Sequence, residues 1–335
     1  APNAPSMPYF AVLMALWTQL FLEFWKRKQV RFAMQWGMRG FEAEARPRPE
    51  FIGEVKPDPV LGKPYLYFPR HVALRRFFIS STVVVAFVCV VLTTVFGIFV
   101  YELALRSSRD AVYQGQDQSK TVASILNVMQ IQFFNAVYGY VAKVLNDYEN
   151  HRTDAQFEDA LIAKTFVFQF INSFSALFYL AFVKPFIPEL DNCYESCMDE
   201  LSNQLFVILV GQLITGNLTE IGVPAVMQWM NKNSESSQEE YDYEDITEIE
   251  RESFKADYDV MLGTFADYAE LMMQFGYTTL FVASFPLAPM LAFVSNYVEI
   301  RVDAWKLCQQ SKRPEPVSCE DIGTWQTIVS VMSLA

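Results

Sequence analysis

Long apolar segments alternate with short charged or proline-bearing segments along the whole chain. An apolar stretch of about 20 residues is long enough for a helix to cross the hydrocarbon core of a membrane. The pattern therefore predicts an all-α fold, namely a polytopic transmembrane helical bundle. The predicted membrane spans are residues 8–24, 77–105, 121–145, 157–183, 201–229, 263–285, 287–305 and 325–335. Since the last apolar run reaches the final residue, we expect the chain to be a fragment of a longer membrane protein.

Clusters of basic residues indicate which ends of the predicted spans face the cytoplasm. The basic run 26–28 closes the first span, and further basic residues within 306–313 follow the span 287–305. Loops rich in lysine and arginine remain on the cytoplasmic side of a membrane. We therefore place the proline-bearing connector 46–74 and the acidic linker 231–260 on that side.

The composition excludes several classes of function. Hydrophobic residues make up 52% of the 335 residues and the mean hydropathy is positive, which is too apolar for an ordinary soluble protein of this length. The net charge of −12 argues against nucleic acid as a partner. The chain has two histidines and lacks the motifs GxxxxGK[ST], GxGxxG, HExxH and GxSxG, so no enzymatic activity is predicted. For Cys193 and Cys197, a disulfide and two free thiols both remain open.

Five carboxylates are predicted to lie at one depth of the membrane. The helical hairpin 261–305 carries an acidic pair near each end, and each pair is spaced three or four residues apart on one helix face. At roughly 1.5 Å per residue, both pairs lie about 26 to 28 Å from the hairpin tip at Pro286. An acid of the span 201–229 reaches the same depth. The five residues are Glu220, Asp267, Glu270, Glu299 and Asp303.

Such a cluster predicts a metal site. Five negative charges cannot lie close together in low dielectric unless protons or a cation neutralise them. A hard divalent ion with six to eight oxygen ligands fits best, which favours calcium, supplied from the cytosol. Acids at helix ends can also be simple interfacial residues, but five at matched depth favour the site. Asn217 is a further candidate ligand or a packing residue, and Gly211 and Gly216 are either a gating hinge or positions of close helix packing.

Amide side chains lie within two predicted spans. Asn127 and Gln130 belong to the span 121–145, and Gln169 belongs to the span 157–183. Amides at membrane depth line a cavity or make contacts between helices, and both interpretations remain open. If they line a cavity, these three residues are candidates for a permeation path.

Several motifs resemble those of the anoctamins, a family of calcium-activated chloride channels and phospholipid scramblases. The matching segments include FLEFWKRK at 21–28, NLTEIGVP at 217–224, QFGY at 274–277, FVASFPLAP at 281–289 and EIRVDA at 299–304. The resemblance covers essentially the whole chain. It implies a dimeric protein with ten transmembrane helices per subunit, of which this chain spans the second helix to the start of the ninth.

The resemblance also implies roles for individual residues. The implied calcium ligands lie on the sixth, seventh and eighth family helices: Glu220, Asp267, Glu270, Glu299 and Asp303. The family usually has asparagine where this chain has Gly216, with Asn217 beside it, and Asp267 replaces a more usual glutamate. Glu23 resembles an acid of a second calcium site, with an interfacial salt bridge to the adjacent basic residues as the alternative.

The residues of the implied pore bear on what is transported. The positions nearest to the pore-lining lysines of the family's anion channels are Gln169 and Gly211 here. A less basic furrow lined by amides favours lipid headgroups or unselective ions over strict anion selectivity. We therefore expect a calcium-activated phospholipid scramblase with associated ion conduction, and keep a chloride channel and a membrane tether as alternatives. Membrane lipids and anions or other small ions would be its partners, and the full-length protein would form a homodimer in the plasma membrane or an internal membrane.

Overall fold

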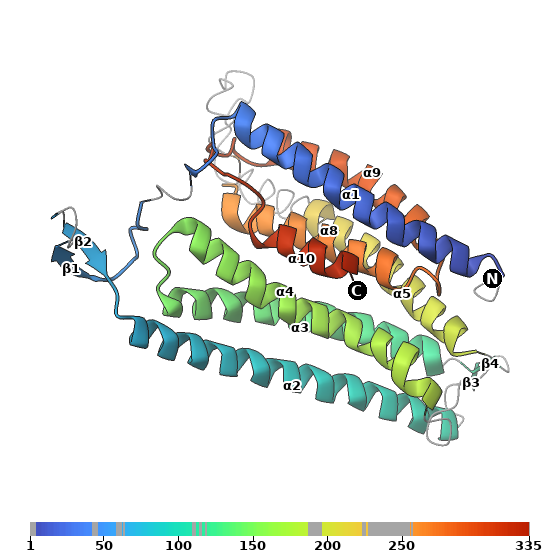
Figure 1. Cartoon of the computed structure of the whole chain (residues 1–335). Helices are drawn as coiled ribbons and strands as arrows, with labels where there is room; N and C mark the ends of the chain where they lie inside the picture. Colours follow the sequence, from blue (N-terminus) through green and yellow to red (C-terminus); the bar gives the residue numbers. More distant parts are fainter. Residues whose placement is uncertain are drawn as a thin grey trace, which may run out of the picture. The chain divides into compact units, whose positions relative to one another are not determined.

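The structure of the chain, a computed structural model, is almost entirely helical (Figure 1). It describes residues 5–41, 46–57, 62, 64–108, 112–113, 116–117, 119–186, 196–222, 226, 255 and 257–334. The α-helices are α1 (Met7–Gln35), α2 (Arg70–Ser108), α3 (Ser119–Glu149), α4 (Asp154–Phe178), α5 (Cys197–Asn217), α8 (Val260–Leu280), α9 (Ala288–Trp305) and α10 (Thr324–Leu334). The predicted all-α fold class is confirmed.

Short pieces of other secondary structure extend three of these helices or connect them. Wider π-helical turns are η2 (Tyr179–Val183), η4 (Leu218–Gly222) and η5 (Lys306–Gln310), and η3 (Lys184–Phe186) is a 3-10 turn. Two small antiparallel hairpins pair β1 (Glu54–Pro57) with β2 (Pro64–Tyr67) and β3 (Val112–Tyr113) with β4 (Gln116–Asp117). Since π-turns are frequent at functional sites, η4 and η5 draw attention to the ends of α5 and α9.

The chain divides into two compact units. The first unit comprises Ala1–Ala15 and Ser202–Val317, and the second comprises Leu16–Leu201 and Ser318–Ala335. The first unit contains α8 and α9 with most of α5, and the second contains α2, α3, α4 and α10. Most of the predicted acidic linker 231–260 lies outside the described residues.

In the second unit, α2, α3 and α4 pack side by side around an aromatic core (Figure 1). The ring of Tyr138 on α3 stacks on the ring of Phe168 on α4, with centroids 3.8 Å apart. Phe87 of α2 meets both rings edge-on, at 5.8 and 6.4 Å. Stacked and edge-on rings are both favourable arrangements of aromatic quadrupoles, so one cluster holds three helices together.

Helix α10 packs against α1 in the same unit, although the two lie far apart in sequence. Gln19 Nε2 of α1 donates to the backbone carbonyl of Ser333 at 2.7 Å. Further along α1, Gln29 Nε2 donates to Gln326 Oε1 of α10 at 3.0 Å. These two amide contacts fix α10 along the part of α1 between Gln19 and Gln29.

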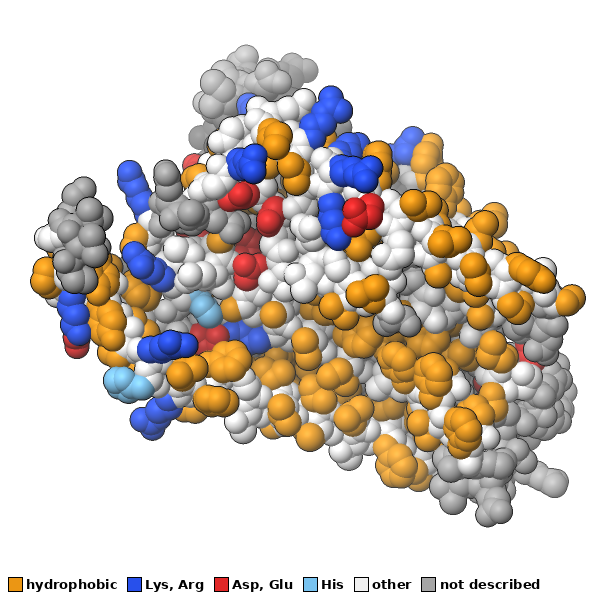
Figure 2. All heavy atoms as spheres, in the orientation of Figure 1, with side chains coloured by type: hydrophobic (Ala, Val, Ile, Leu, Met, Phe, Trp, Pro, Cys, Tyr) orange, Lys and Arg blue, Asp and Glu red, His pale blue; other side chains and the backbone are white. Residues whose placement is uncertain are grey.

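Much apolar surface remains exposed on the long helices. The structure has three helices long and apolar enough to cross a membrane, counted over its described residues: Met7–Gln35, Arg70–Leu105 and Asp154–Phe186. Along α2, for example, Phe78 and Phe96 are 65% and 66% exposed. Figure 2 shows hydrophobic side chains spread densely over the region that α2 occupies in Figure 1. A surface of this kind is unfavourable in water and is expected against lipid.

The tip of the α8 and α9 hairpin differs from its predicted position. The predicted spans 263–285 and 287–305 place the tip at Pro286, but α8 already ends at Leu280 and α9 begins at Ala288. Pro286 lacks a backbone N–H and cannot lie inside a helix, so it prevents α8 and α9 from joining, but α8 ends earlier, at Leu280. The positions at which the helices would enter and leave a membrane remain predictions.

The structure bears on whether Cys193 and Cys197 form a disulfide or are free thiols. Cys197 is disulfide-bonded, while Cys89, Cys308 and Cys319 are free. Cys193 lies outside the described residues.

Candidate metal centre

The α8 and α9 hairpin sets the register of the four predicted ligands that it carries. Helix α8 begins where Asp259 Oδ1 accepts hydrogen bonds from the backbone N–H groups of Met261 and Leu262, at 3.1 and 3.0 Å. Such an N-cap satisfies donors that the first helical turn leaves open. Helix α9 begins with Pro289 in its first turn, where a missing N–H is tolerated. Each helix then presents its acidic pair on one face.

Asp267 of α8 and Asp303 of α9 meet at one lysine. The Lys306 Nζ atom lies 3.0 Å from Asp267 Oδ1 and 2.8 Å from Asp303 Oδ1. The three side chains are 16%, 26% and 30% exposed, in the order lysine, Asp267 and Asp303, so the cluster is largely shielded from water. The structure therefore brings two predicted ligands from different helices together around a cation.

Glu270 lies beside the backbone of α5. A Cβ atom built at Gly216 would lie 3.4 Å from Glu270 Oε1 and 3.9 Å from Glu270 Oε2. The missing side chain at Gly216 thus leaves the carboxylate room to approach the helix. This contact brings a third predicted ligand toward the segment that carries Glu220.

A small cavity opens next to this contact. It has a volume of about 20 Å³ and is lined by α5, α8 and α9, with Gln212, Glu270, Gln274 and Ser295 as its polar residues. A cavity of this size has room for about one water molecule or ion. Because its polar lining is made of oxygen-bearing side chains, it can accommodate a hard cation.

The remaining predicted ligands are described less completely. Glu299 is half-buried on α9. Glu220 lies in η4 and Asn217 ends α5, but their side chains lie outside what the structure describes. Among the residues whose side chains are described, no three acidic, histidine or cysteine side chains are placed to hold a metal together. The donor set still fits calcium, because all of the proposed ligands offer oxygen atoms and their charge exceeds that of one lysine.

The predicted hinge lies within regular helix. Helix α5 is α-helical through Gly211 and Gly216 and first changes to the wider π-turn at Leu218. Thr215 Oγ1 donates to the carbonyl of Gly211 at 2.8 Å, a bond that can bend a helix in an apolar environment. The hinge role of the two glycines remains a prediction.

One ion pair and one hydrogen bond hold the segment after α9 against the segment before α8. Lys312 Nζ lies 2.8 Å from Asp257 Oδ1, and Lys255 Nζ donates to the carbonyl of Cys308 at 3.4 Å. Next to them, burial and the charge of Asp267 raise the pKa of the Tyr258 hydroxyl. The basic residues within 306–313 were predicted only to mark the cytoplasmic side of the membrane. The contact of Lys306 with two predicted ligands was not predicted.

Comparison with known proteins shows to which family the chain belongs. A family model described as "Anoctamin: Calcium-activated chloride channel" matches residues 2–335. The chain belongs to the anoctamin family. It is 34% identical to human Anoctamin-7 over 96% of its length, 33% identical to human Anoctamin-5 over 98% and 33% identical to mouse Anoctamin-4 over 96%. It spans 37%, 39% and 36% of those three proteins, respectively, which is less than half of each.

Family membership makes the chain part of an integral membrane protein. The matching family model is described by calcium-activated chloride channels, and the chain covers less than half of each relative named above. The names of the relatives do not distinguish between a channel and a scramblase.

The second predicted calcium site of this anoctamin chain rests on Glu23 alone. Glu23 Oε1 lies 3.2 Å from Lys26 Nζ, one helical turn away, and the glutamate side chain is 57% exposed. An exposed pair of this type contributes little to stability. The salt bridge to the adjacent basic residue is present, and both its interfacial position and a role of Glu23 in a second metal site remain predictions.

Of the three amides proposed for a permeation path, Gln130 lies in a buried hydrogen-bond network. Gln130 Nε2 of α3 donates to Asn172 Oδ1 of α4 at 2.6 Å, and Asn172 Nδ2 donates to Asn135 Oδ1 at 2.8 Å. Asn127 is 4% exposed and its amide makes no hydrogen bond to any residue that the structure describes, while Gln169 is half-buried. Gln130 therefore makes a contact between helices, which is one of the two interpretations left open by the sequence. A role of the amides in permeation remains a prediction.

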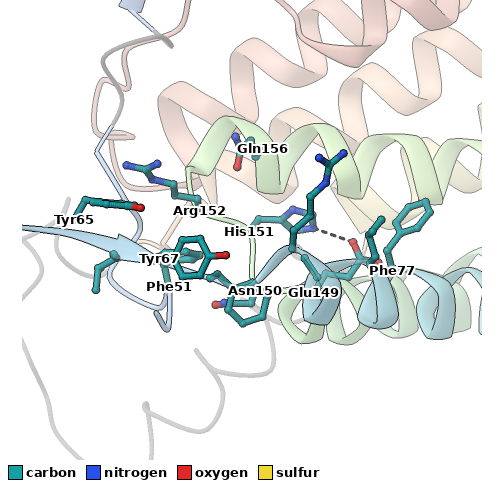
Figure 3. Close-up of a pocket in the computed structure, with 14 residues that line it drawn as sticks. Phe51, Tyr65, Tyr67, Phe77, Glu149, Asn150, His151, Arg152 and Gln156 are labelled. Carbon is teal, nitrogen blue, oxygen red and sulfur yellow. Dashed lines mark hydrogen bonds and ion pairs between the residues drawn. The ribbon is translucent and has the colours of Figure 1, made fainter. Parts of the chain in front are cut away.

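A larger pocket lies in the second unit, where α3 turns into α4 (Figure 3). It has a volume of about 450 Å³, and its wall includes Phe51, Tyr65 and Tyr67 as well as the start of α2. Asn150 forms the turn with a φ of 61°, a conformation that asparagine tolerates, and its amide exchanges two hydrogen bonds of 2.9 Å with the backbone of Ile52. These contacts join the β1 and β2 segment to the helices.

Glu149 forms a compact ion cluster at the floor of this pocket. Figure 3 shows Glu149 and His151 pointing toward one another. Glu149 Oε2 lies 3.0 Å from His151 Nε2 and 2.7 Å from Lys164 Nζ. Burial acts to raise the pKa of Glu149, but hydrogen bonds from His151, Lys164 and Ser80 outweigh it and hold the pKa below its ordinary value. The carboxylate is therefore ionised and paired at neutral pH.

Proposed function

We propose that the anoctamin containing this chain is a calcium-activated phospholipid scramblase with associated ion conduction, acting as a homodimer. The observation that carries the proposal is the convergence of Asp267 and Asp303, from two helices, on one cationic group. Carboxylates that gather around a positive charge at helix ends form the oxygen-rich environment that a calcium ion requires.

The residues proposed to hold calcium are Glu220, Asp267, Glu270, Glu299 and Asp303, with Asn217 as a further candidate. When bound, the ion supplies the positive charge that balances these carboxylates. Without that charge, the acids of α8 and α9 repel Glu220, and the end of α5 moves away from the hairpin about Gly211 or Gly216. With the charge balanced, α5 can approach the hairpin and a groove opens for transport.

The choice of a scramblase over a chloride channel rests on the residues of the proposed path. Gln169 and Gly211 are the positions nearest to the pore-lining lysines of the family's anion channels, and Asn127 and Gln130 add uncharged amides. A path without fixed positive charge has little means of selecting anions. A calcium-activated chloride channel remains the second candidate because the matching family model is described by that activity. A membrane tether without transport is the third.

The test uses the full-length protein in liposomes that contain a fluorescent phospholipid and chloride. Lipid flipping and chloride efflux are followed with and without micromolar calcium. The proposal expects flipping that depends on calcium, with any ion leak accompanying it. Chloride efflux without flipping would identify a channel, and the absence of both would favour the tether.

A further inference from the structure

Lys306 holds the two aspartates of the metal centre together. Its ammonium group bridges Asp267 and Asp303, which lie on different helices, at 3.0 and 2.8 Å. An ordinary surface pair would join Lys306 only to Asp303, three residues away on the same chain segment. The additional bond to Asp267 places the ammonium group between the helices, among the residues proposed to bind calcium.

The backbone of Lys306 is fixed independently of its side chain. Its N–H group donates to the carbonyls of Val302 and Asp303, and its carbonyl accepts bonds from the N–H and hydroxyl of Ser311 at 3.0 and 2.7 Å. The lysine stem has four methylene groups and rotates freely. The ammonium group can therefore leave the aspartates without any change in the backbone.

The ammonium group and a calcium ion compete for the same oxygen atoms. Calcium requires its ligand oxygens at 2.3–2.6 Å, and a second positive charge a few ångströms away is repelled in a poorly solvated site. Lysine supplies one positive charge and a divalent ion supplies two. A cluster with a surplus of carboxylates consequently favours calcium once the ion concentration is high enough.

We propose that Lys306 is a tethered cation that occupies the aspartate pair in the absence of calcium and must be displaced when the ion binds. This inference rests on the proposed calcium site and adds a regulatory element to it. Lys306 lowers repulsion between α8 and α9 in the ion-free protein, and it also raises the calcium concentration needed to fill the site. The lysine thus sets the calcium threshold.

The test measures calcium binding directly, by titration calorimetry on the full-length protein in nanodiscs. Removing the ammonium group with Lys306→Gln should tighten calcium binding about tenfold or more. The same variant should unfold at a lower temperature than wild type in a calcium chelator, because the aspartates then repel one another. It should also gain more thermal stability from calcium than wild type does.

Lys312→Gln is the matched control. It removes the same charge from the same segment, but the partner of Lys312 is Asp257, whose side chain is 88% exposed and which is not one of the proposed ligands. Its calcium affinity should equal that of wild type. Lys306→Arg keeps a cation that can bridge two carboxylates, so its affinity should be equal to or lower than that of wild type. This variant also serves as the test if Lys306→Gln does not fold.

Each remaining outcome overturns a defined claim. If wild type binds calcium and Glu299→Ala binds it more weakly, but Lys306→Gln binds with unchanged or lower affinity, the tethered-cation inference is wrong and the calcium site stands. Tighter binding by Lys306→Arg would have the same meaning. If wild type does not bind calcium, or if Glu299→Ala binds as wild type does, the proposed site fails and the inference fails with it.

Discussion

Two lysine and carboxylate clusters, one in each unit, resemble each other in the burial of the lysine and differ in the balance of their charges. In the second unit Lys164 pairs with Glu149, and their side chains are 13% and 5% exposed. In the first unit Lys306, which is 16% exposed, is shared by Asp267 and Asp303. The first arrangement matches one cation with one anion, whereas the second divides one cation between two anions.

This difference separates a structural ion pair from a candidate ligand site. In a buried pair with matched charges, each charge neutralises the other. Removing one partner leaves an uncompensated buried charge. A cluster with excess negative charge is stable only if a proton or a further cation joins it. We therefore expect mutations in the two clusters to have opposite effects on stability and on calcium response.

The largest expected effect is on stability, in the balanced cluster. Lys164→Met leaves the buried charge of Glu149 without its main partner and should lower the free energy of unfolding by about 3 kcal/mol. Thermal unfolding in detergent measures the loss. The double variant Lys164→Met with Glu149→Gln should recover part of it, and the calcium concentration for half-activation should match that of wild type. A changed calcium response with intact stability would contradict the comparison.

In the unbalanced cluster we expect the opposite pattern. Glu299→Ala removes one of the proposed ligands and should raise the calcium concentration for half-activation at least tenfold, which corresponds to about 1.4 kcal/mol of binding free energy. Its stability in a calcium chelator should equal or exceed that of wild type, because one negative charge is gone. Lipid flipping across a calcium series gives the first quantity and thermal unfolding gives the second. An unchanged half-activating concentration would remove Glu299 from the site.

A smaller effect is expected in the amide network of α3 and α4. Gln130→Leu removes the bond to Asn172 and should lower the free energy of unfolding by about 1 kcal/mol. If the amides also line the path, flipping at saturating calcium should become slower while the half-activating concentration stays the same. Gln132→Leu, at an exposed position of the same helix, is the control. Equal flipping rates in wild type and Gln130→Leu would restrict this amide to a packing role.

The smallest effect concerns the contact between Glu270 and α5. In Gly216→Ala the added methyl group would lie 3.4 Å from Glu270 Oε1, so the carboxylate must shift slightly. The half-activating calcium concentration should rise about two- to threefold, which is on the order of 0.5 kcal/mol. Gly97→Ala provides the matched control in the other unit, because a methyl group there meets nothing within 4 Å. Both variants should gain helix stability, and only Gly216→Ala should change the calcium response.

The sequence predicted those features that follow from local pattern. The apolar runs predicted the helical fold because a helix in a membrane must be apolar over a fixed length. The spacing of Asp267 and Glu270, and of Glu299 and Asp303, predicted shared helix faces because helical periodicity is regular. The sequence also predicted that α8 would stop before Pro286, because proline is excluded from a helix interior, but it did not predict the end at Leu280.

Features that depend on contacts between distant residues were not predicted. The bridge from Lys306 to Asp267 joins positions 39 residues apart, and the sequence gives no sign that a lysine beyond the end of α9 turns back toward α8. The π-turns η4 and η5 have no simple pattern of residues either. Packing partners such as Asn172 for Gln130 are decided by how two helices rotate against each other, which the amide content alone does not fix.

The pairing of α1 with α10 also has a consequence for the order of events during synthesis. Gln19 and Ser333 are separated by 314 positions, and Gln29 and Gln326 by 297. At ribosomal rates of roughly 5–20 residues per second, the glutamines of α1 wait on the order of 15–60 s before their partners are made. During that interval water, another molecule or another part of the chain must provide the hydrogen bonds of these amides. The contacts of α10 with α1 therefore form only after almost the whole chain has been synthesised, so they cannot guide the early insertion of α1.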